Sequence, residues 1–365
     1  MNSLFIIFLI LPYCILLLAF TVGVVLSQRK KQPSHSEAFI SVIIAARNEE
    51  ENIEEVINSI LAQDYPSSNF EIIVVDDHSD DATIIRIPRS PLVRIVVLPN
   101  GSFGKKAALK AGVETALFPY IAATDADCIA SPFWLKTLAG TIKQKHPALI
   151  VGPVSLPFSN SFLETFQHWE FRALQMVTFG SAALKYPTLC NGANLCFSKD
   201  EYNRVNLKEE ETPSGDDIFL LHHLLKEKKA VEFCLSKEML ITSKPETAFY
   251  AMLQQKIRWA SKSKHITNPA TLALGGITFI TNLIAVAVIP YTIVNPERYI
   301  SISLIWGPKI IAEAILVFVP GKKVYGAYPK TASFILSALL MPFYATFVAL
   351  ASLFLKFTWK KRTQS

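Results

Sequence analysis

The run Tyr120-Ile121-Ala122-Ala123-Thr124-Asp125-Ala126-Asp127 indicates the fold of the central part of the chain. Its first five residues have the character of a buried β-strand, and two carboxylates follow the strand directly. Side chains two residues apart in an extended segment share a side, so we expect Asp125 and Asp127 to face the same way. Mg²⁺ and Mn²⁺ bind such carboxylates together with the phosphates of a nucleotide. The run therefore predicts a Mn²⁺ or Mg²⁺ site on Asp125 and Asp127; alone, an Asp-x-Asp triplet also fits a solvated turn.

Strand and helix patterns alternate around this run. Apolar runs typical of strands occur at 40–46, 71–75 and 93–98. Amphipathic, helix-compatible stretches occur at 49–62 and 105–116. Alternation of this kind is typical of an α/β fold with a mostly parallel sheet in a Rossmann-like layer, where ligands bind at the carboxyl ends of the strands. Acidic residues at the ends of two strands therefore lie where a ligand is expected.

Long apolar segments flank this central part. Residues 4–26 carry no charge and are long enough to cross a membrane, as are residues 271–294 and 331–355. The segment 300–320 contains Lys309 and Glu313, which lie four residues apart and could pair on one helix face. We favour a spanning helix here, and a helix lying at the membrane interface is the alternative.

These segments divide the chain into three predicted regions. We expect an N-terminal transmembrane anchor at 1–27, a catalytic domain at 38–265 and a C-terminal transmembrane region of two to three helices at 266–365. The basic cluster at 28–31 follows the first span, which predicts a cytoplasmic catalytic domain. The sequence thus predicts an integral protein of the cell (inner) membrane, in contact with membrane lipids.

Composition excludes several classes of protein. The chain has 365 residues, 51% of them hydrophobic, and a formal net charge of +6. Its basic runs lie beside apolar spans, where lipid headgroups explain them better than nucleic acid does, so we expect no nucleic-acid partner. The five cysteines are odd in number and lack paired Cys-x-x-Cys spacing, so neither a disulfide framework nor a zinc site is predicted.

Two later motifs carry polar residues suited to catalysis and binding. In Gly215-Asp216-Asp217 a carboxylate could act as a general base, although either aspartate could instead cap the helix expected at 218–225. Further on, Gln255, Arg258 and Trp259 fall at i, i+3 and i+4 and would share one helix face. That face suits a diphosphate and a sugar ring, while an Arg-Trp pair anchoring a helix beside the bilayer is the alternative.

From about Ser41 to Trp259 the chain resembles the family-2 glycosyltransferases. These enzymes invert the configuration at the anomeric carbon of the sugar and have the GT-A nucleotide-sugar fold. The Gln-x-x-Arg-Trp motif also resembles one in ceramide glucosyltransferases and in cellulose and hyaluronan synthases. The stretches that carry the resemblance are Ser41–Glu49, Val75–Asp81, Gly104–Gly112, Asp125–Asp127, Asn191–Phe197, Gly215–Asp217 and Gln255–Trp259.

The resemblance implies a role for each matching residue. Asp217 would be the general base, with Asp216 beside it, and Asp125 and Asp127 would hold the metal. Gly192, Asn194 and Trp259 would line the acceptor side, although a tight turn explains Gly192 and Asn194 about equally well. The residues that would bind the nucleotide-diphosphate donor, which is a UDP-sugar in much of the family, are Ala45, Asp77, Lys105, Asp125, Gln255, Arg258 and Trp259.

Three functions fit these patterns. The first is transfer of one sugar to a hydroxyl of a lipid or lipid-linked glycan acceptor, as in the biosynthesis of cell-envelope glycans or glycolipids. The second is a processive polysaccharide synthase, for which three or four helices make a poor conduit. The third is a non-catalytic membrane protein that binds nucleotide sugars. The intact set of acidic residues favours an enzyme, and the number of spans favours the first function.

Overall fold

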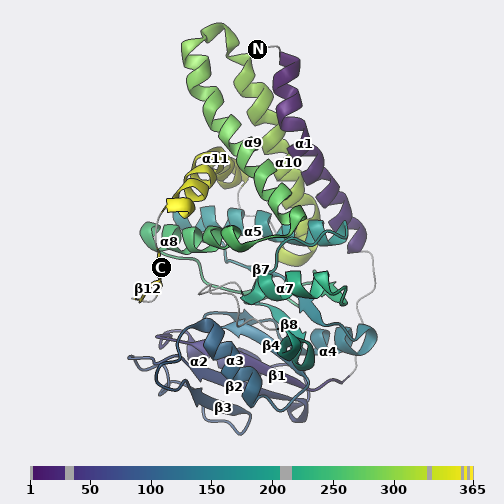
Figure 1. Ribbon diagram of the computed structural model, residues 1–365, viewed down its shortest axis with the longest axis vertical. Coiled ribbons are helices and arrows are strands. Elements are labelled where there is room, and N and C mark those ends of the chain that lie inside the picture. The colour runs from purple at the N-terminus through teal and green to yellow at the C-terminus, as the bar shows by residue number, and fades with distance from the viewer. Residues whose placement is uncertain are drawn as a thin grey trace. The chain divides into compact units, whose positions relative to one another are not determined.

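The structure is a computed structural model that describes residues 3–28, 37–205, 216–326, 331–354, 357–359 and 362–364. Contacts divide the chain into two compact units (Figure 1). The sheet unit comprises 31–155 and 189–244, and the helical unit comprises 1–30, 156–188 and 245–365.

A mixed sheet forms the centre of the sheet unit. Its strand order is β3-β2-β1-β4-β8-β6-β9, and β8 alone runs antiparallel to its neighbours β4 and β6. The predicted, mostly parallel α/β sheet is therefore confirmed. A smaller sheet has the order β5-β10-β7. The strands are β1 (Ile40–Ala46), β2 (Phe70–Asp76), β3 (Val93–Val97), β4 (Tyr120–Asp125), β5 (Ile129–Ala130), β6 (Leu149–Val151), β7 (Val154–Ser155), β8 (Leu195–Ser198), β9 (Val231–Phe233) and β10 (Ile241–Thr242).

Helices connect these strands. They are α2 (Ile53–Leu61), α3 (Lys105–Thr115), α4 (Trp134–Lys145), α6 (Lys199–Arg204) and α7 (Asp216–Lys226). The helix predicted at 49–62 begins four residues later than expected. The reason is that the backbone N–H groups of Glu49 and Glu50 donate to Thr83 Oγ1 at 2.7 Å and to Asp81 Oδ2 at 3.2 Å, which holds the chain in a turn after β1.

The core between the sheet and α3 is apolar and tightly packed. Ile43 of β1, Ile73 of β2 and Val113 of α3 belong to one buried cluster. The helix approaches β1 most closely at Gly112, where an added Cβ would lie 2.6 Å from Ile43 Cγ2. A glycine is needed here because any side chain at this position would overlap with the strand.

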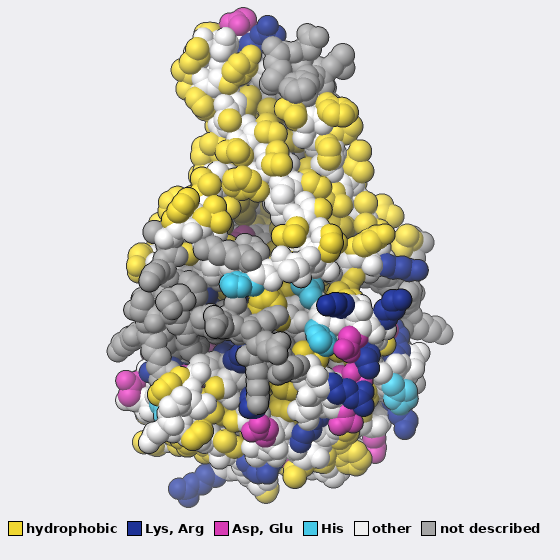
Figure 2. All heavy atoms as spheres, in the orientation of Figure 1, with side chains coloured by type: hydrophobic (Ala, Val, Ile, Leu, Met, Phe, Trp, Pro, Cys, Tyr) yellow, Lys and Arg dark blue, Asp and Glu magenta, His cyan; other side chains and the backbone are white. Residues whose placement is uncertain are grey.

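The helical unit contains α1 (Ser3–Ser27), α5 (Phe162–Ala183), α8 (Phe249–Ser261), α9 (Pro269–Val294), α10 (Ile300–Tyr325) and α11 (Thr331–Phe354), followed by the hairpin β11 (Phe357–Trp359) and β12 (Arg362–Gln364). Among the described residues, α1, α9, α10 and α11 are long and apolar enough to cross a membrane. Apolar side chains cover α1, α9 and α10 on the face drawn in Figure 2. Such a surface is suited to lipid.

Helix α10 contains the predicted ion pair. Lys309 Nζ lies 2.5 Å from Glu313 Oε1, and the Tyr13 hydroxyl of α1 donates to the same oxygen at 2.7 Å. Lys309 is fully buried, so the pair faces the interior of the helical unit. Because the charges are paired and turned inward, the helix keeps the length and apolar outer surface of a membrane span.

Helices α5 and α8 belong to the helical unit, although both lie within the region 38–265 predicted as one domain. Glu246 N–H, just before α8, donates to Gln167 Oε1 of α5 at 3.0 Å, and Lys256 of α8 pairs with Glu170 of α5 at 2.6 Å. Within 38–265, the sheet unit therefore accounts for 38–155 and 189–244. The boundaries near 38 and 265 stay predictions.

We expect Gly112→Ala to lower the thermal unfolding midpoint of the full-length protein in detergent. Overpacking against Ile43 costs about 1–3 kcal/mol. The matched control is Gly275→Ala in α9, where an added Cβ meets no atom within 4 Å. Alanine has the higher helix propensity at both positions, so the difference between the two variants isolates the crowding. Equal midpoints for the two variants would contradict the close approach of α3 to β1.

Candidate active site

The carboxyl ends of three neighbouring strands place the predicted residues at one edge of the sheet. Ala45 is in register with Val75 on one side and with Asp125 on the other, and Ala46 is opposite Asp76. Parallel strands end at a common edge, so Asp125 at the end of β4 lies beside the turns that follow β1 and β2. Ala45 is half-buried and lies next to Asp125 in the sheet.

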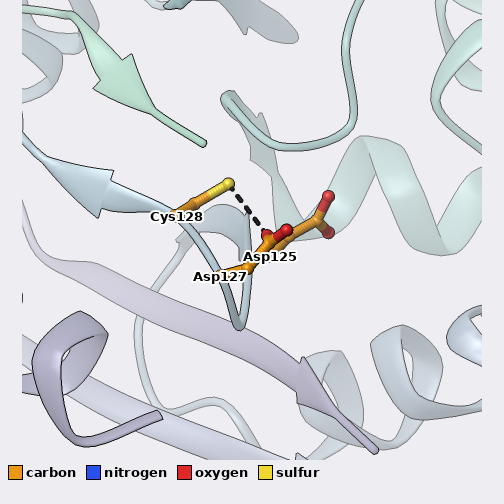
Figure 3. A group of neighbouring side chains, drawn as sticks. All are labelled: Asp125, Asp127 and Cys128. Atoms are coloured by element: carbon orange, nitrogen blue, oxygen red, sulfur yellow. Dashed lines mark hydrogen bonds between the residues drawn. The ribbon is translucent and has the colours of Figure 1, made fainter. Parts of the chain in front are cut away.

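Asp125, Asp127 and Cys128 form a compact cluster after β4 (Figure 3). One potential ligand atom from each lies within 4.8 Å of the others. The Cys128 thiol donates to Asp127 Oδ1 at 3.3 Å. Burial raises the pKa of this thiol well above its usual range, and the nearby carboxylates raise it further, so it stays protonated and acts as a donor.

The environment of Asp127 holds an excess of negative charge. Burial raises the pKa of Asp127 to about 6, and the carboxylates of Asp125 and Glu49 add to the shift. A carboxylate with a raised pKa is one whose ionised form lacks sufficient positive partners. The donor set, two carboxylate oxygens with surplus negative charge, fits a hard divalent cation such as Mn²⁺ or Mg²⁺.

Lys105, the first residue of α3, supplies one positive charge to this edge. Its Nζ forms an ion pair with Asp125 Oδ1, and the two side chains are 39% and 35% exposed. Burial alone would lower the pKa of Lys105, but the carboxylates of Asp125 and Asp217 outweigh it and raise the pKa. Lys105 is therefore a permanent cation at physiological pH.

Asp217, near the start of α7, joins the same group. Its Oδ2 accepts the Gly192 backbone N–H at 3.0 Å, and its Oδ1 accepts the Ile218 N–H at 2.9 Å. A Cβ on Gly192 would lie 3.2 Å from Asp217 Oδ2 and 3.5 Å from Lys105 Nζ. Lys105 Nζ thus lies close to both Asp125 and Asp217. Asp216 begins α7, and both its side chain and Gly215 fall outside the described parts.

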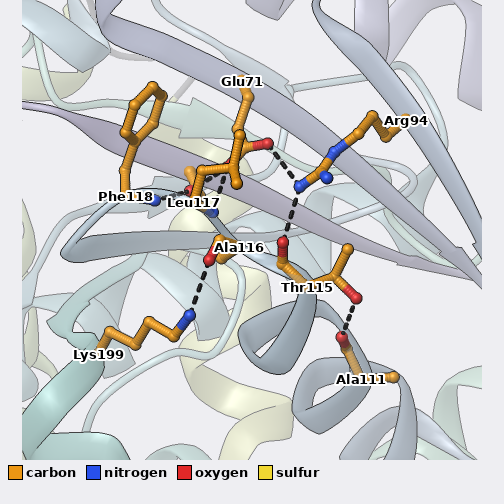
Figure 4. Close-up of polar contacts among 9 residues, drawn as sticks. Glu71, Arg94, Ala111, Thr115, Ala116, Leu117, Phe118 and Lys199 are labelled. Atoms are coloured by element: carbon orange, nitrogen blue, oxygen red, sulfur yellow. Dashed lines mark hydrogen bonds and ion pairs between the residues drawn. The ribbon is translucent and has the colours of Figure 1, made fainter.

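A polar network at the opposite end of the sheet fixes the connection between α3 and β4 (Figure 4). The buried Glu71 of β2 accepts the Leu117 N–H at 2.7 Å and pairs with Arg94 of β3 at 2.7 Å. Arg94 also donates to the Thr115 carbonyl, the last residue of α3, at 2.7 Å. Because α3 ends and β4 begins at this network, it ties together the two elements that carry Lys105 and Asp125 at their other ends.

Asp77 is almost fully buried, and its position organises the start of α3. Its Oδ2 accepts the Gly104 N–H at 3.0 Å, and its carbonyl accepts Arg47 Nη1 at 2.6 Å. Gly104 has φ +92°, a conformation that glycine adopts without strain. Asp77 thus ties the turn after β2 to the residue preceding Lys105. Its contact with a nucleoside stays a prediction.

Asn194 is 1% exposed, and its side-chain amide forms hydrogen bonds inside the fold. It donates to the carbonyls of Pro153 and Met239, both at 2.7 Å, and accepts from Trp134 Nε1 at 2.9 Å. These contacts favour the alternative in which the 191–194 segment is a tight structural turn. Gly192, by contrast, lies against the carboxylate of Asp217.

Gln255, Arg258 and Trp259 lie on one helix, α8, as the spacing predicts. In the helical unit, Gln255 donates to Glu246 Oε1 at 3.1 Å, and Lys256 Nζ lies 4.4 Å from the centre of a Trp259 ring. The buried Lys256 also pairs with Glu170. These contacts fix the orientation of the helix, and donor binding by this motif stays a prediction.

The sequence patterns give Glu49 no role, yet its negative charge helps to raise the pKa of Asp127. The signal was present, because Glu49 follows β1 and therefore lies on the ligand edge of the sheet. A separate cavity of about 490 Å³ runs along α3, lined among others by Leu98, Phe103 and Lys106. It contains none of the predicted site residues, so the candidate site rests on the carboxylate cluster.

Comparison with known proteins finds relatives of this chain among glycosyltransferases. The profile of the family described as Glycosyl transferase family 2 matches residues 41–199. Glycosyltransferase AglE of Haloferax volcanii is 28% identical over 183 residues, which cover 49% of this chain and 59% of that protein. Dodecaprenyl-phosphate galacturonate synthase of Rhizobium johnstonii is 28% identical over 136 residues, covering 36% and 40%. The matches span less than two thirds of either relative.

One solved structure resembles the whole chain. It is the mannosyltransferase PcManGT from Pyrobaculum calidifontis in complex with GDP-Man and Mn²⁺, with a TM-score of 0.59 at 16% identity. The superposition covers 97% of this chain and 99% of that chain. At this identity the likeness shows the fold, which is the predicted GT-A fold.

The charge at Asp127 leads to a prediction about pH and stability in the presence of a chelator. A carboxyl whose pKa is raised on folding lowers stability as pH rises from about 4 to 6, and the full cost is present above 6. We therefore expect Asp127→Asn to raise the thermal unfolding midpoint at pH 8, to raise it less at pH 5, and to have little effect below pH 4. The control, Asp64→Asn at a carboxylate that is 57% exposed and paired with Lys136, should give no gain at pH 8. A lower midpoint for Asp127→Asn at pH 8 would contradict the charge excess.

Proposed function

Residues 41–199 form a family-2 glycosyltransferase domain, and from that premise we propose that the chain transfers a single sugar from a nucleotide-diphosphate sugar to a hydroxyl of a lipid or lipid-linked acceptor at the membrane. The observation that carries this proposal is that Lys105 Nζ lies close to both Asp125 and Asp217. These three residues come from separate stretches of chain and would supply what sugar transfer needs, namely a metal ligand, a cation for phosphate and a base.

The donor end of the site is assigned to the edge formed by β1, β2 and β4. Asp125 and Asp127 would hold Mn²⁺ or Mg²⁺, which when bound neutralises charge on the departing diphosphate. Lys105 would place its ammonium against the same diphosphate. Ala45 and Asp77, in neighbouring strand ends, would contact the nucleoside. The family resemblance favours UDP.

Asp217 is assigned as the general base. Its carboxylate, held by the N–H groups of Gly192 and Ile218, would accept the proton of the acceptor hydroxyl. The hydroxyl oxygen then forms a bond to the anomeric carbon while the bond from that carbon to the diphosphate oxygen breaks on the opposite face. The electron pair of the broken bond leaves with the nucleoside diphosphate, and the configuration at the anomeric carbon is inverted.

The Gln-x-x-Arg-Trp motif is assigned to the donor and acceptor. Arg258 would bind the diphosphate and Trp259 would offer a flat wall to a sugar. Support comes from the placement of all three residues on one helix whose orientation is fixed by the Lys256–Glu170 ion pair. An anchoring role at the membrane interface is the alternative, since Trp and Arg also favour that region.

The lipid nature of the acceptor is supported by two observations. Four described helices are long and apolar enough to cross a membrane, and one relative is a dodecaprenyl-phosphate galacturonate synthase. The basic cluster at 28–31 favours a cytoplasmic site at the inner membrane. The acceptor would then approach from the bilayer while the donor arrives from water.

We expect Asp217→Asn to abolish sugar transfer while leaving metal-dependent nucleotide binding largely intact, because only the proton acceptor is removed. Asp127→Ala should lose both. The measurement is turnover of a panel of nucleotide sugars with Mn²⁺ and membrane lipids by detergent-purified protein, together with nucleotide affinity by calorimetry. Asp64→Asn should match the wild type in both. Normal turnover by Asp217→Asn would show that another residue is the base.

Mass analysis of lipid extracts from the same reactions should show a lipid heavier by one sugar. Products with many sugars would show a processive synthase instead. If the wild-type protein turned over none of the donors with lipids present, the result would favour a non-catalytic nucleotide-sugar-binding protein.

A further inference from the structure

One carboxylate of the candidate site would serve two cations. Asp125 forms an ion pair with Lys105, and under the proposed function it is also a ligand of the divalent metal. Two positive groups on one carboxylate repel each other. The repulsion acts at close range because Lys105 Nζ is in direct contact with an oxygen of the Asp125 carboxylate.

The position of Lys105 allows it to leave Asp125 without disturbing the fold. It is the first residue of α3, and the preceding Gly104 is held separately by Asp77. Its side chain is 39% exposed, so it is not enclosed by the packed interior. The long, flexible lysine stem lets the charge move between partners while the backbone stays in place.

A nucleoside diphosphate is an anion able to attract Lys105 away from Asp125. We propose that Lys105 is an internal counter-ion of Asp125 that lowers the metal affinity of the site when no nucleotide is bound. A nucleoside diphosphate would pair with Lys105 in place of Asp125, so that metal and nucleotide bind cooperatively. This inference rests on the proposed function, because it takes the metal ligands and the donor class from it. Binding coupling is reciprocal, so each ligand tightens the other by the same factor.

A simpler role for Lys105 gives a different outcome. If it acted only as a phosphate ligand, removing its charge would weaken nucleotide binding and leave nucleotide-free metal binding unchanged. If it acted as the counter-ion, removing its charge would tighten nucleotide-free metal binding while weakening nucleotide binding. The two affinities therefore move in opposite directions only under the proposal.

The experiment measures Mn²⁺ affinity of the full-length protein in detergent by electron paramagnetic resonance of the free ion, with and without UDP or GDP. Neither nucleotide carries a sugar, so no turnover occurs. For Lys105→Met without nucleotide we expect Mn²⁺ to bind about tenfold more tightly than to the wild type, from the loss of one nearby positive charge. The tightening of Mn²⁺ binding by nucleotide should be smaller in this variant than in the wild type.

Two further variants separate charge from structure. Lys105→Arg keeps the positive charge, so its nucleotide-free Mn²⁺ affinity should stay within about twofold of the wild type. Lys110→Met removes one positive charge from the same helix at a side chain that is 51% exposed and 3.6 Å from Glu114. Its Mn²⁺ affinity should also stay within about twofold, because exposed charges are screened.

Three results would overturn the proposal. The first is nucleotide-free Mn²⁺ affinity in Lys105→Met that is unchanged or weaker. The second is equal tightening in Lys110→Met, which would make the effect one of net charge. The third, which needs no variant, is wild-type Mn²⁺ affinity that does not respond to nucleotide. If the wild type transfers sugar, these results refute only the counter-ion role of Lys105. If the wild type binds neither UDP nor GDP and turns over no donor, the proposed function itself is refuted.

Discussion

The candidate site depends on the crowding of carboxylates at the carboxyl edge of a parallel sheet. Asp125 and Asp127 follow β4, and the charge of Glu49, after β1, reaches Asp127. Like charges at close range disfavour ionisation, and one ammonium, that of Lys105, offsets only part of the excess. The same imbalance that raises the pKa of Asp127 makes this edge suited to a divalent cation. The cost to stability and the capacity to bind metal therefore have one physical origin.

The rest of the sheet unit keeps that edge rigid. At the far end, Glu71 binds Arg94 and the Leu117 N–H, so the connection from α3 to β4 is fixed where no ligand is expected. In the interior, Gly112 lets α3 lie directly against Ile43. A helix held at its end and along its length presents its first residue, Lys105, at a defined position.

The helical unit uses buried ion pairs in a similar way. Lys309 and Glu313 pair within α10 and receive the Tyr13 hydroxyl of α1, while Lys256 of α8 pairs with Glu170 of α5. Buried charges are costly unless they are paired, so each set constrains which helix faces meet. The second pair also places Lys256 over the Trp259 ring. The orientation of the Gln-x-x-Arg-Trp helix is therefore tied to the packing of α5 and α8.

The sequence by itself determined the parallel α/β layer, the strand that ends at Asp125, the four apolar helices and the pairing of Lys309 with Glu313, because periodicity and spacing are local properties. Only the tertiary structure decided that Lys105 lies close to both Asp125 and Asp217, that the Asn194 amide forms its hydrogen bonds inside the fold, and that α5 and α8 pack with the long helices. It also moved the start of α2 to Ile53, since the 81–83 turn binds the N–H groups of Glu49 and Glu50. These outcomes depend on which distant segments meet, and local sequence patterns carry no information about the hydrogen-bond partners that a residue finds across the fold.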